Sequence, residues 1–188
     1  MTEQLLLQNL SEGRLKELTE NNNKALLVGV YFSSQEKEDV EEYLEELEEL
    51  SKTYGLEVKK KVMVPLKKFT SATYIGTGKV EEIARICEEE GIDIVVFDDE
   101  IAPHQQRNLE KEFKKIVIDR TELILGVFAR RAQTKEAKIQ IDLARFKYQL
   151  PRLKRMWTHL ERQKTGGASG GYLKGMGERQ IEVDRRLI

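Results

Sequence analysis

Apolar positions between residues 24 and 120 fall into two kinds of segment that alternate along the chain. Short runs rich in β-branched and aromatic residues predict strands, at 25–32, 57–64, 92–97 and 115–118. Apolar residues at helical spacing predict helices between them, at 35–54, 78–90 and 102–113. Gly55 and Gly91 follow two of these helices and are expected to end them. Alternating strands and helices favour parallel pairing, so we expect an α/β fold, a small mostly parallel sheet with helices on both faces.

The pattern changes at Thr121, where alanines and long charged residues become frequent and glycine is absent from 127 through 165. A long helix is predicted here, capped by Thr121, with a heptad seam at Ile139, Leu143, Phe146, Leu150, Leu153, Trp157 and Leu160. Pro151 lies within the seam without changing its phase, which favours a kinked or briefly interrupted helix.

A second helix is predicted at 178–188, where Ile181 and Ile188 lie seven apart, and the pattern stops in mid-helix. We therefore expect a piece of a longer chain with an N-terminal extension at 1–23, an α/β subdomain at 24–120 and a helical subdomain at 121–188. Such a seam, left uncovered, favours self-association.

Composition excludes several classes of protein. The 188 residues are 39% hydrophobic and 35% charged, which excludes collagen-like and fully disordered chains. A single cysteine, Cys87, excludes an internal disulfide and fits a reducing compartment. No run reaches 18 apolar residues and no secretory signal precedes the first strand, so a cytoplasmic location is expected.

Charge is divided unevenly along the chain. Residues 1–120 hold 17 Lys+Arg and 26 Asp+Glu, a net of −9, and residues 121–188 hold 15 and 7, a net of +8. Such a division indicates a basic limb that meets nucleic acid, carried on an acidic body whose local basic point is Lys59-Lys60-Lys61. A charged helix that lacks its neighbour would give the same division.

Polar residues follow the predicted strands, at the edge where α/β sheets bind ligands. These are Ser33-Ser34, Lys67-Lys68 and Asp98-Asp99-Glu100. The acidic trio has the oxygen ligands of a metal site, although such a run more often caps the next helix. A structural role is also expected for Asp119-Arg120-Thr121, with Arg120 paired to a carboxylate. His104 and His159 lie far apart without a Cys/His cluster, so no zinc site or other metal site is predicted with them.

The turn Gly76-Thr77-Gly78-Lys79 resembles part of a phosphate-binding loop. Thr73 stands where the first glycine is required and Val80 where the magnesium-binding hydroxyl is required. A weak anion or nucleotide site at the helix N-terminus and a plain structural turn both remain open.

The segment 166–177 has six glycines in twelve residues, flanked and interrupted by basic and aromatic side chains. Basic residues neutralise phosphates, glycine permits close backbone approach, and aromatics stack on exposed bases. The predicted RNA-binding residues are Arg152, Lys154, Arg155, Arg162, Lys164, Gly166, Gly167, Gly170, Gly171, Tyr172, Lys174, Gly175, Gly177 and Arg179. A hairpin loop without RNA contact is the alternative.

This segment, GGASGGYLKGMGERQIEVDRR, resembles the glycine-rich signature of the HflX translational GTPases. Further similar blocks, in the same order, are YIGTGKVEEI, PHQQRNLEK, IDRTELIL, FARRAQTKEAKIQIDLA and YQLPRLKRMWTHLERQ. Within the loop, residues 168–176 and Arg179 depart from the usual Ile-Gly-Thr-Arg-Gly-Pro and Glu-Thr-Gln of the family.

The resemblance implies an α/β subdomain, an antiparallel helical hairpin and then a GTPase domain that would follow residue 188. It implies binding to the large ribosomal subunit and its ribosomal RNA, in ribosome splitting, rescue or assembly. GTP and magnesium belong to the following domain, so no catalytic residue and no cofactor are expected in this chain. The alternative function is a nucleotide- or small-molecule-binding α/β enzyme domain with its site at the strand ends.

Overall fold

The computed structural model describes residues 23–165, with side chains for residues 23–150. The chain divides into two compact units, one up to Arg131 and one from Ala132 onward. The first contains the sheet, and in the second the described structure is a helix. The two units are described separately below.

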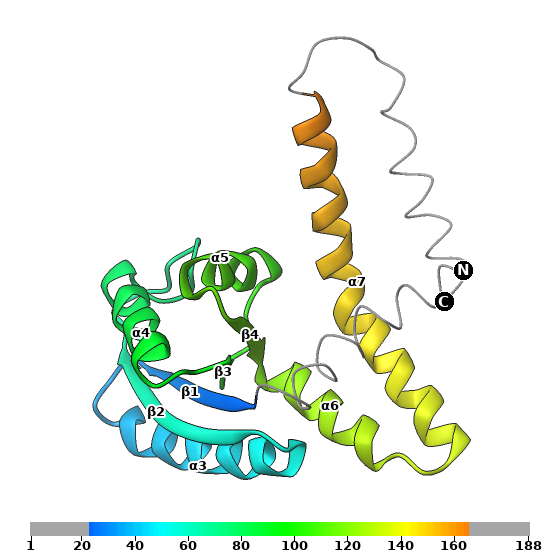
Figure 1. Cartoon of the computed structure of the whole chain (residues 1–188), viewed down its shortest axis with the longest axis horizontal. Helices are drawn as coiled ribbons and strands as arrows, with labels where there is room; N and C mark the ends of the chain where they lie inside the picture. Colours follow the sequence, from blue (N-terminus) through cyan, green and yellow to red (C-terminus); the bar gives the residue numbers. More distant parts are fainter. Residues whose placement is uncertain (1–22, 166–188) are drawn as a thin grey trace. The chain divides into compact units, whose positions relative to one another are not determined.

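The sheet has four strands in the order β2-β1-β3-β4, and all of its neighbouring pairs are parallel (Figure 1). Its strands are β1 (Lys24–Tyr31), β2 (Glu57–Pro65), β3 (Ile94–Phe97) and β4 (Ile116–Asp119). All four residues of β3 are buried, as are six of the eight residues of β1. The predicted α/β class is confirmed, with a sheet that is entirely parallel in the described part of the chain.

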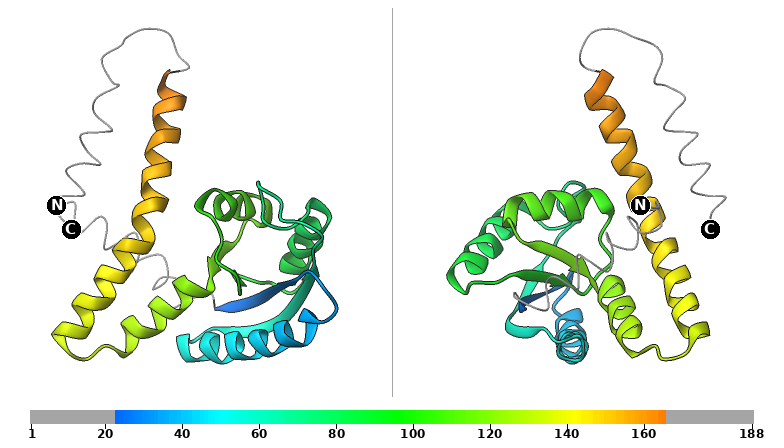
Figure 2. Two further views of the ribbon diagram at one scale, coloured as in Figure 1. Left: turned by 180° about the vertical axis from the view of Figure 1, so that it is seen from behind. Right: turned by 45° about the vertical axis from the view of Figure 1, so that its right-hand side comes forward.

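Helices cover both faces of the sheet (Figure 2). One face packs against α3 (Glu36–Tyr54) and α6 (Arg120–Arg131), the other against α4 (Thr77–Glu89) and α5 (Pro103–Phe113). Strand β1 supplies both cores in alternation, because Leu26 and Val28 face α4 and α5 whereas Leu27 faces α3 and α6. Gly55 ends α3 in the left-handed conformation at φ 96°, as its position predicted.

The segment predicted as one long helix from Thr121 is two helices. α6 ends at Arg131 and α7 (Lys135–Thr165) begins after a three-residue connection. Thr134 provides the start signal for α7, since its hydroxyl accepts a hydrogen bond from the Ala137 amide at 3.1 Å. Leu123 and Val127 of α6 are buried against α3, so α6 belongs to the same compact unit as the sheet. The sequence pattern had assigned this helix to the helical subdomain.

Asp119, rather than Thr121, caps α6. Its carboxylate accepts a hydrogen bond from the Glu122 amide at 2.9 Å and another from the Ile101 amide at 3.4 Å. α7 continues through Pro151 as one helix, so of the two predicted forms, kinked or briefly interrupted, the interruption is absent. The helices predicted near residues 11–19 and at 178–188 lie outside the described residues.

Gly29 lies in β1 against α3, at a close approach of strand and helix. A Cβ added here would lie 2.7 Å from Cγ1 of Val40 and 3.0 Å from Cγ of Leu44. We expect Gly29→Ala to lower the free energy of unfolding by about 1–3 kcal/mol, because the helix must move outward. Chemical denaturation measures this, with Gly78→Ala as the matched control. A Cβ at Gly78 meets no atom within 4 Å, so a loss equal to that of Gly29→Ala would contradict the packing argument.

Candidate nucleic-acid interface

The basic residues predicted to bind RNA begin in the second half of α7. Arg152, Lys154, Arg155, Arg162 and Lys164 all fall within this helix, whose backbone is described to Thr165. Helical periodicity places positions 152, 155 and 162 toward one side and the seam positions 153, 157 and 160 toward the other. At 1.5 Å per residue, the 31 residues of α7 extend about 46 Å. The basic positions are therefore spaced regularly along one long helix.

The rest of the predicted interface lies outside the described residues. It comprises the glycine-rich segment with Tyr172 and Lys174, and Arg179 after it. Their assignment to RNA contact stays a prediction.

The turn at Gly76 starts α4 and presents open space around its glycines. A Cβ at Gly76 or Gly78 meets no atom within 4 Å. The carbonyl of Gly76 accepts hydrogen bonds from the amides of Lys79 and Val80, each at 3.0 Å. The Lys79 ammonium forms an ion pair with Glu82 at 2.7 Å. The geometry is that of a helix start whose lysine has an internal partner, and the weak anion site formed with Thr77 stays a prediction.

The acidic trio at the end of β3 uses two of its carboxylates inside the protein. Asp98 accepts a hydrogen bond from Arg120 at 2.9 Å, and Asp99 is hydrogen-bonded to the hydroxyl of Tyr74. Burial raises the pKa of Asp99, and the bond from Tyr74 partly opposes that shift. Within residues 23–150, no group of three His, Cys, Asp or Glu side chains is placed to hold a metal ion. The trio does not cap the next helix as predicted, because α5 begins after Ala102 without a side-chain cap; two of its carboxylates are instead internal partners of Arg120 and Tyr74.

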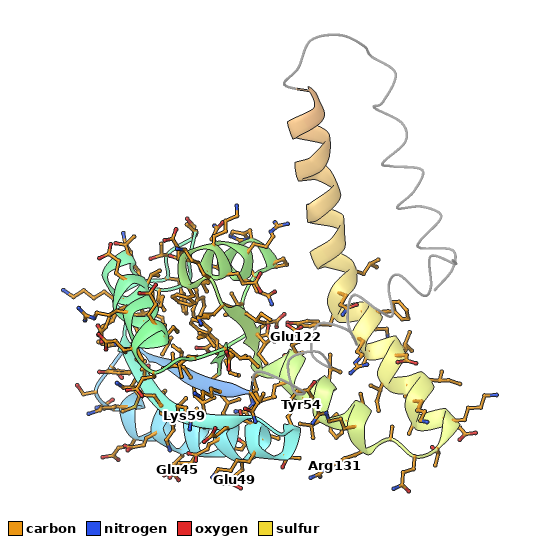
Figure 3. All side chains as sticks on the ribbon, viewed as in Figure 1. Glu45, Glu49, Tyr54, Lys59, Glu122 and Arg131 are labelled. Atoms are coloured by element: carbon orange, nitrogen blue, oxygen red, sulfur yellow. The ribbon has the colours of Figure 1, made fainter. Side chains whose placement is uncertain are left out.

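Arg120 joins three elements of the sheet unit, as its predicted pairing with a carboxylate requires. Besides Asp98 after β3, it contacts Glu46 of α3 at 2.6 Å, and it is itself the first residue of α6. At the other end of α6, the Arg130 guanidinium lies 4.1 Å from the centre of the Tyr54 ring (Figure 3 labels Tyr54). The helix that precedes the connection to α7 is thus fixed at both ends.

Polar residues of α5 hold the loop between β2 and α4, a role that the sequence pattern did not predict. His104, Gln105 and Asn108 bond to the backbone carbonyls of Ser71, Thr70 and Ala72, at 2.8, 3.1 and 2.9 Å. The three α5 residues are adjacent or lie three to four positions apart, which places them on one face of the helix. The polar run at the start of this helix was the available signal, although nothing in the local sequence identified its partner.

Two family models match consecutive parts of this chain. The GTP-binding GTPase N-terminal model matches residues 41–129, and the GTP-binding GTPase middle-region model matches residues 131–188. The chain belongs to the HflX family. It is 50% identical to GTPase HflX of Chlamydia pneumoniae over 167 residues, which are 88% of this chain and 35% of that protein.

Other HflX proteins give the same result. GTPase HflX of Flavobacterium psychrophilum is 46% identical over 93% of this chain and 41% of its own length. GTPase HflX of Escherichia coli is 43% identical over 88% of this chain and 37% of its own length. The chain therefore spans about two fifths of the length of these HflX relatives and corresponds to their N-terminal region.

A solved structure with the same fold is a GTP-binding protein from the archaeon Sulfolobus solfataricus, in complex with GDP. It has a TM-score of 0.52 and 25% identity, over 88% of this chain and 46% of that one. A variant of the protein named SsGBP has a TM-score of 0.56 and 30% identity, over 71% of this chain and 42% of its own. No helix within residues 23–165 has the length and apolar character needed to cross a membrane.

Proposed function

We propose that this chain is the ribosome-binding N-terminal region of a cytoplasmic HflX-type GTPase. The helical limb, from α7 through the glycine-rich segment to Arg179, contacts ribosomal RNA of the large subunit in ribosome splitting, rescue or assembly. GTP and magnesium act in a domain that follows residue 188, so the chain alone does not hydrolyse GTP. Family membership supports the GTPase part of this proposal, since the HflX relatives are named GTPases.

The observation that carries RNA binding is the charge of the limb. Residues 128–180 hold 13 Lys+Arg and 4 Asp+Glu, a net of +9, and α7 presents many of them along one helix of 31 residues. An excess of positive charge of this size favours binding to the phosphate backbone of RNA. The apolar seam of the same helix needs a cover, which the predicted second helix or another copy of the chain would supply.

The alternative, a small-molecule or nucleotide enzyme at the strand ends, has less support. The groups that such a site would use are engaged within the protein, Asp98 with Arg120, Asp99 with Tyr74, and Lys79 with Glu82. A catalytic site needs several polar groups that converge on substrate rather than on one another.

Removing three positive charges from α7 tests the proposal. Arg152→Gln, Arg155→Gln and Arg162→Gln together should weaken co-sedimentation with large ribosomal subunits several-fold at moderate salt. We expect about 3–5 phosphate contacts for the parent chain, so log affinity should fall against log salt with a slope of roughly −2 to −4, and the variant should have a flatter slope.

The matched control removes the same number of positive charges from the sheet unit, at Arg85, Lys111 and Lys114. These residues are exposed on α4, on α5 and at the end of α5. Equal binding by the limb variant and the parent at every salt concentration excludes the limb as the RNA contact.

A further inference from the structure

Two exposed phenylalanines meet at the carboxyl ends of the strands. Phe32 follows β1 and is 46% exposed, and Phe69 follows β2 and is 51% exposed. Their ring centres are 4.8 Å apart with an interplanar angle of 82°, an edge-to-face contact. Exposed aromatic rings in contact with each other form a small apolar patch that is a candidate interaction site, and neither ring takes part in the contacts described above.

Buried aromatic rings support Phe69 from within the fold. Tyr74 lies beside it at 4.8 Å with an interplanar angle of 30°, and Tyr74 in turn meets Phe97 of β3 at 6.3 Å. Tyr74 is 8% exposed and Phe97 is fully buried. The row of rings therefore runs from the core to the surface, so Phe69 rests on a rigid base.

The loop that carries Phe69 is held in one conformation by its own hydrogen bonds and by α5. Thr70 and Tyr74 form a reciprocal pair of backbone hydrogen bonds at 2.9 and 2.8 Å, which Tyr74 permits by adopting φ 66°. His104, Gln105 and Asn108 fix three successive carbonyls of the turn that this bridge closes, those of Thr70, Ser71 and Ala72. A ligand that stacks here meets a preorganised surface, so little conformational entropy is lost on binding.

Two exposed lysines beside the pair provide contacts for an anionic partner. Lys67 and Lys68 are exposed directly before Phe69, and neither forms an ion pair with any carboxylate of residues 23–150. The nearby carboxylates have internal donors, since Glu36 accepts the Phe32 amide at 2.8 Å and Asp98 and Asp99 are engaged as described. Glu100 is the exposed exception at this edge.

By contrast, the lysines expected to be the local basic point of this unit have partners. Lys61 lies 2.9 Å from Glu48, Lys60 lies 3.9 Å from Glu90, and Lys59 pairs with Glu57. Phosphate binding at 59–61 would have to break these pairs, whereas Lys67 and Lys68 have none to break among the described residues.

We propose that Phe32 and Phe69 form a stacking platform for an unpaired RNA base, with Lys67 and Lys68 against the neighbouring phosphates. Half-exposed aromatic rings beside lysines are the combination with which proteins bind single-stranded nucleic acid, because every base has a face to stack and a phosphate to neutralise. A protein partner of the same apolar character gains from the two lysines only where it also presents acidic residues. This contact is on the sheet unit and does not rest on the limb.

The test uses the full chain and a single-stranded oligoadenylate of about ten nucleotides, with one adenine replaced by fluorescent 2-aminopurine. Stacking on the platform should quench the reporter. Phe69→Leu keeps the apolar volume and removes the aromatic face, so we expect roughly five-fold or more loss of affinity together with loss of the quench. Lys67→Gln with Lys68→Gln should instead keep the quench and reduce the salt slope by about 1.4.

Matched controls separate this site from general effects. Tyr43→Leu removes an aromatic ring that is 48% exposed on α3, and Lys59→Gln with Lys60→Gln removes two lysines that have partners. Both should bind the probe like the parent. Thermal unfolding of Phe69→Leu should match that of Tyr43→Leu. If Phe69→Leu does alter local packing, Phe69→Tyr is the second test, because it keeps an aromatic face and should quench the probe like the parent.

Two outcomes overturn the proposal. One is binding and quenching by Phe69→Leu equal to the parent, which would leave the pair as a surface for a protein partner. The other is full displacement of the probe by adenosine monophosphate at equal affinity, which would indicate a free-nucleotide site. The limb variant of Arg152, Arg155 and Arg162 is measured in parallel, so that failure of either RNA contact is seen apart from the other.

Discussion

Replacing Phe97 by alanine should lower the free energy of unfolding of the sheet unit by about 3–5 kcal/mol. Phe97 ends β3 with no exposed surface and pairs in register with Val28 and Asp119 on the two neighbouring strands. Its removal leaves a cavity in the core shared with α4 and α5, which parallel strands on both sides prevent from closing. Urea denaturation followed by circular dichroism measures the loss.

Phe128→Ala is the control for this substitution. Phe128 lies in α6 with 56% of its surface exposed, and alanine is a strong helix former, so its loss should stay within about 0.5 kcal/mol. Equal losses of unfolding free energy for Phe97→Ala and Phe128→Ala would mean that the core around Phe97 contributes little to stability. If Phe97→Ala had the same free energy of unfolding as the parent, the claim that buried rings hold Phe69 rigidly would also fail.

Asp119→Ala should lower the free energy of unfolding by about 2–4 kcal/mol, the second large effect. Asp119 is 2% exposed and serves two amides, one at the start of α6 and one at Ile101. Loss of a helix cap costs about 0.5–2 kcal/mol, and a buried amide without an acceptor costs about 1–3 kcal/mol more. Equilibrium denaturation gives the total.

Asp119→Asn keeps only one of the two acceptor oxygens, so it should recover part of that loss, because its amide nitrogen cannot accept the second hydrogen bond. Thr121→Ala tests the cap expected from sequence, and it should change stability by less than about 0.5 kcal/mol. A larger loss for Thr121→Ala than for Asp119→Ala would reverse the assignment of the cap.

The α/β pattern was predictable because its signals are local. A strand buried on both faces must be apolar throughout, as 25–30 is, and a helix that stops at Gly55 needs the left-handed conformation that glycine adopts without strain. The class of fold, the order of its elements and most of their ends follow from such signals.

The division between α6 and α7 was not predicted because the connection 132–134 contains neither glycine nor proline. Thr134 is a good cap, but threonine is also tolerated within helices, so its role becomes visible only when its hydroxyl is seen on the Ala137 amide.

The hydrogen bonds from α5 to the loop before α4 join residues more than 30 positions apart, and so does the contact of Phe32 with Phe69. Both depend on which strands become neighbours. In the helical limb, the residues predicted to bind RNA were chosen by residue type, because positive charge can be counted along the sequence without a structure.

Strand β2 is one of the two outer strands of the described sheet and carries three consecutive lysines. An intruding strand from another molecule would have to strip water from these ammonium groups and displace their ion pairs with Glu48, Glu57 and Glu90. Pro65 at the end of β2 offers no amide hydrogen to such a strand. The free edge of β2 therefore disfavours edge-to-edge pairing with another molecule.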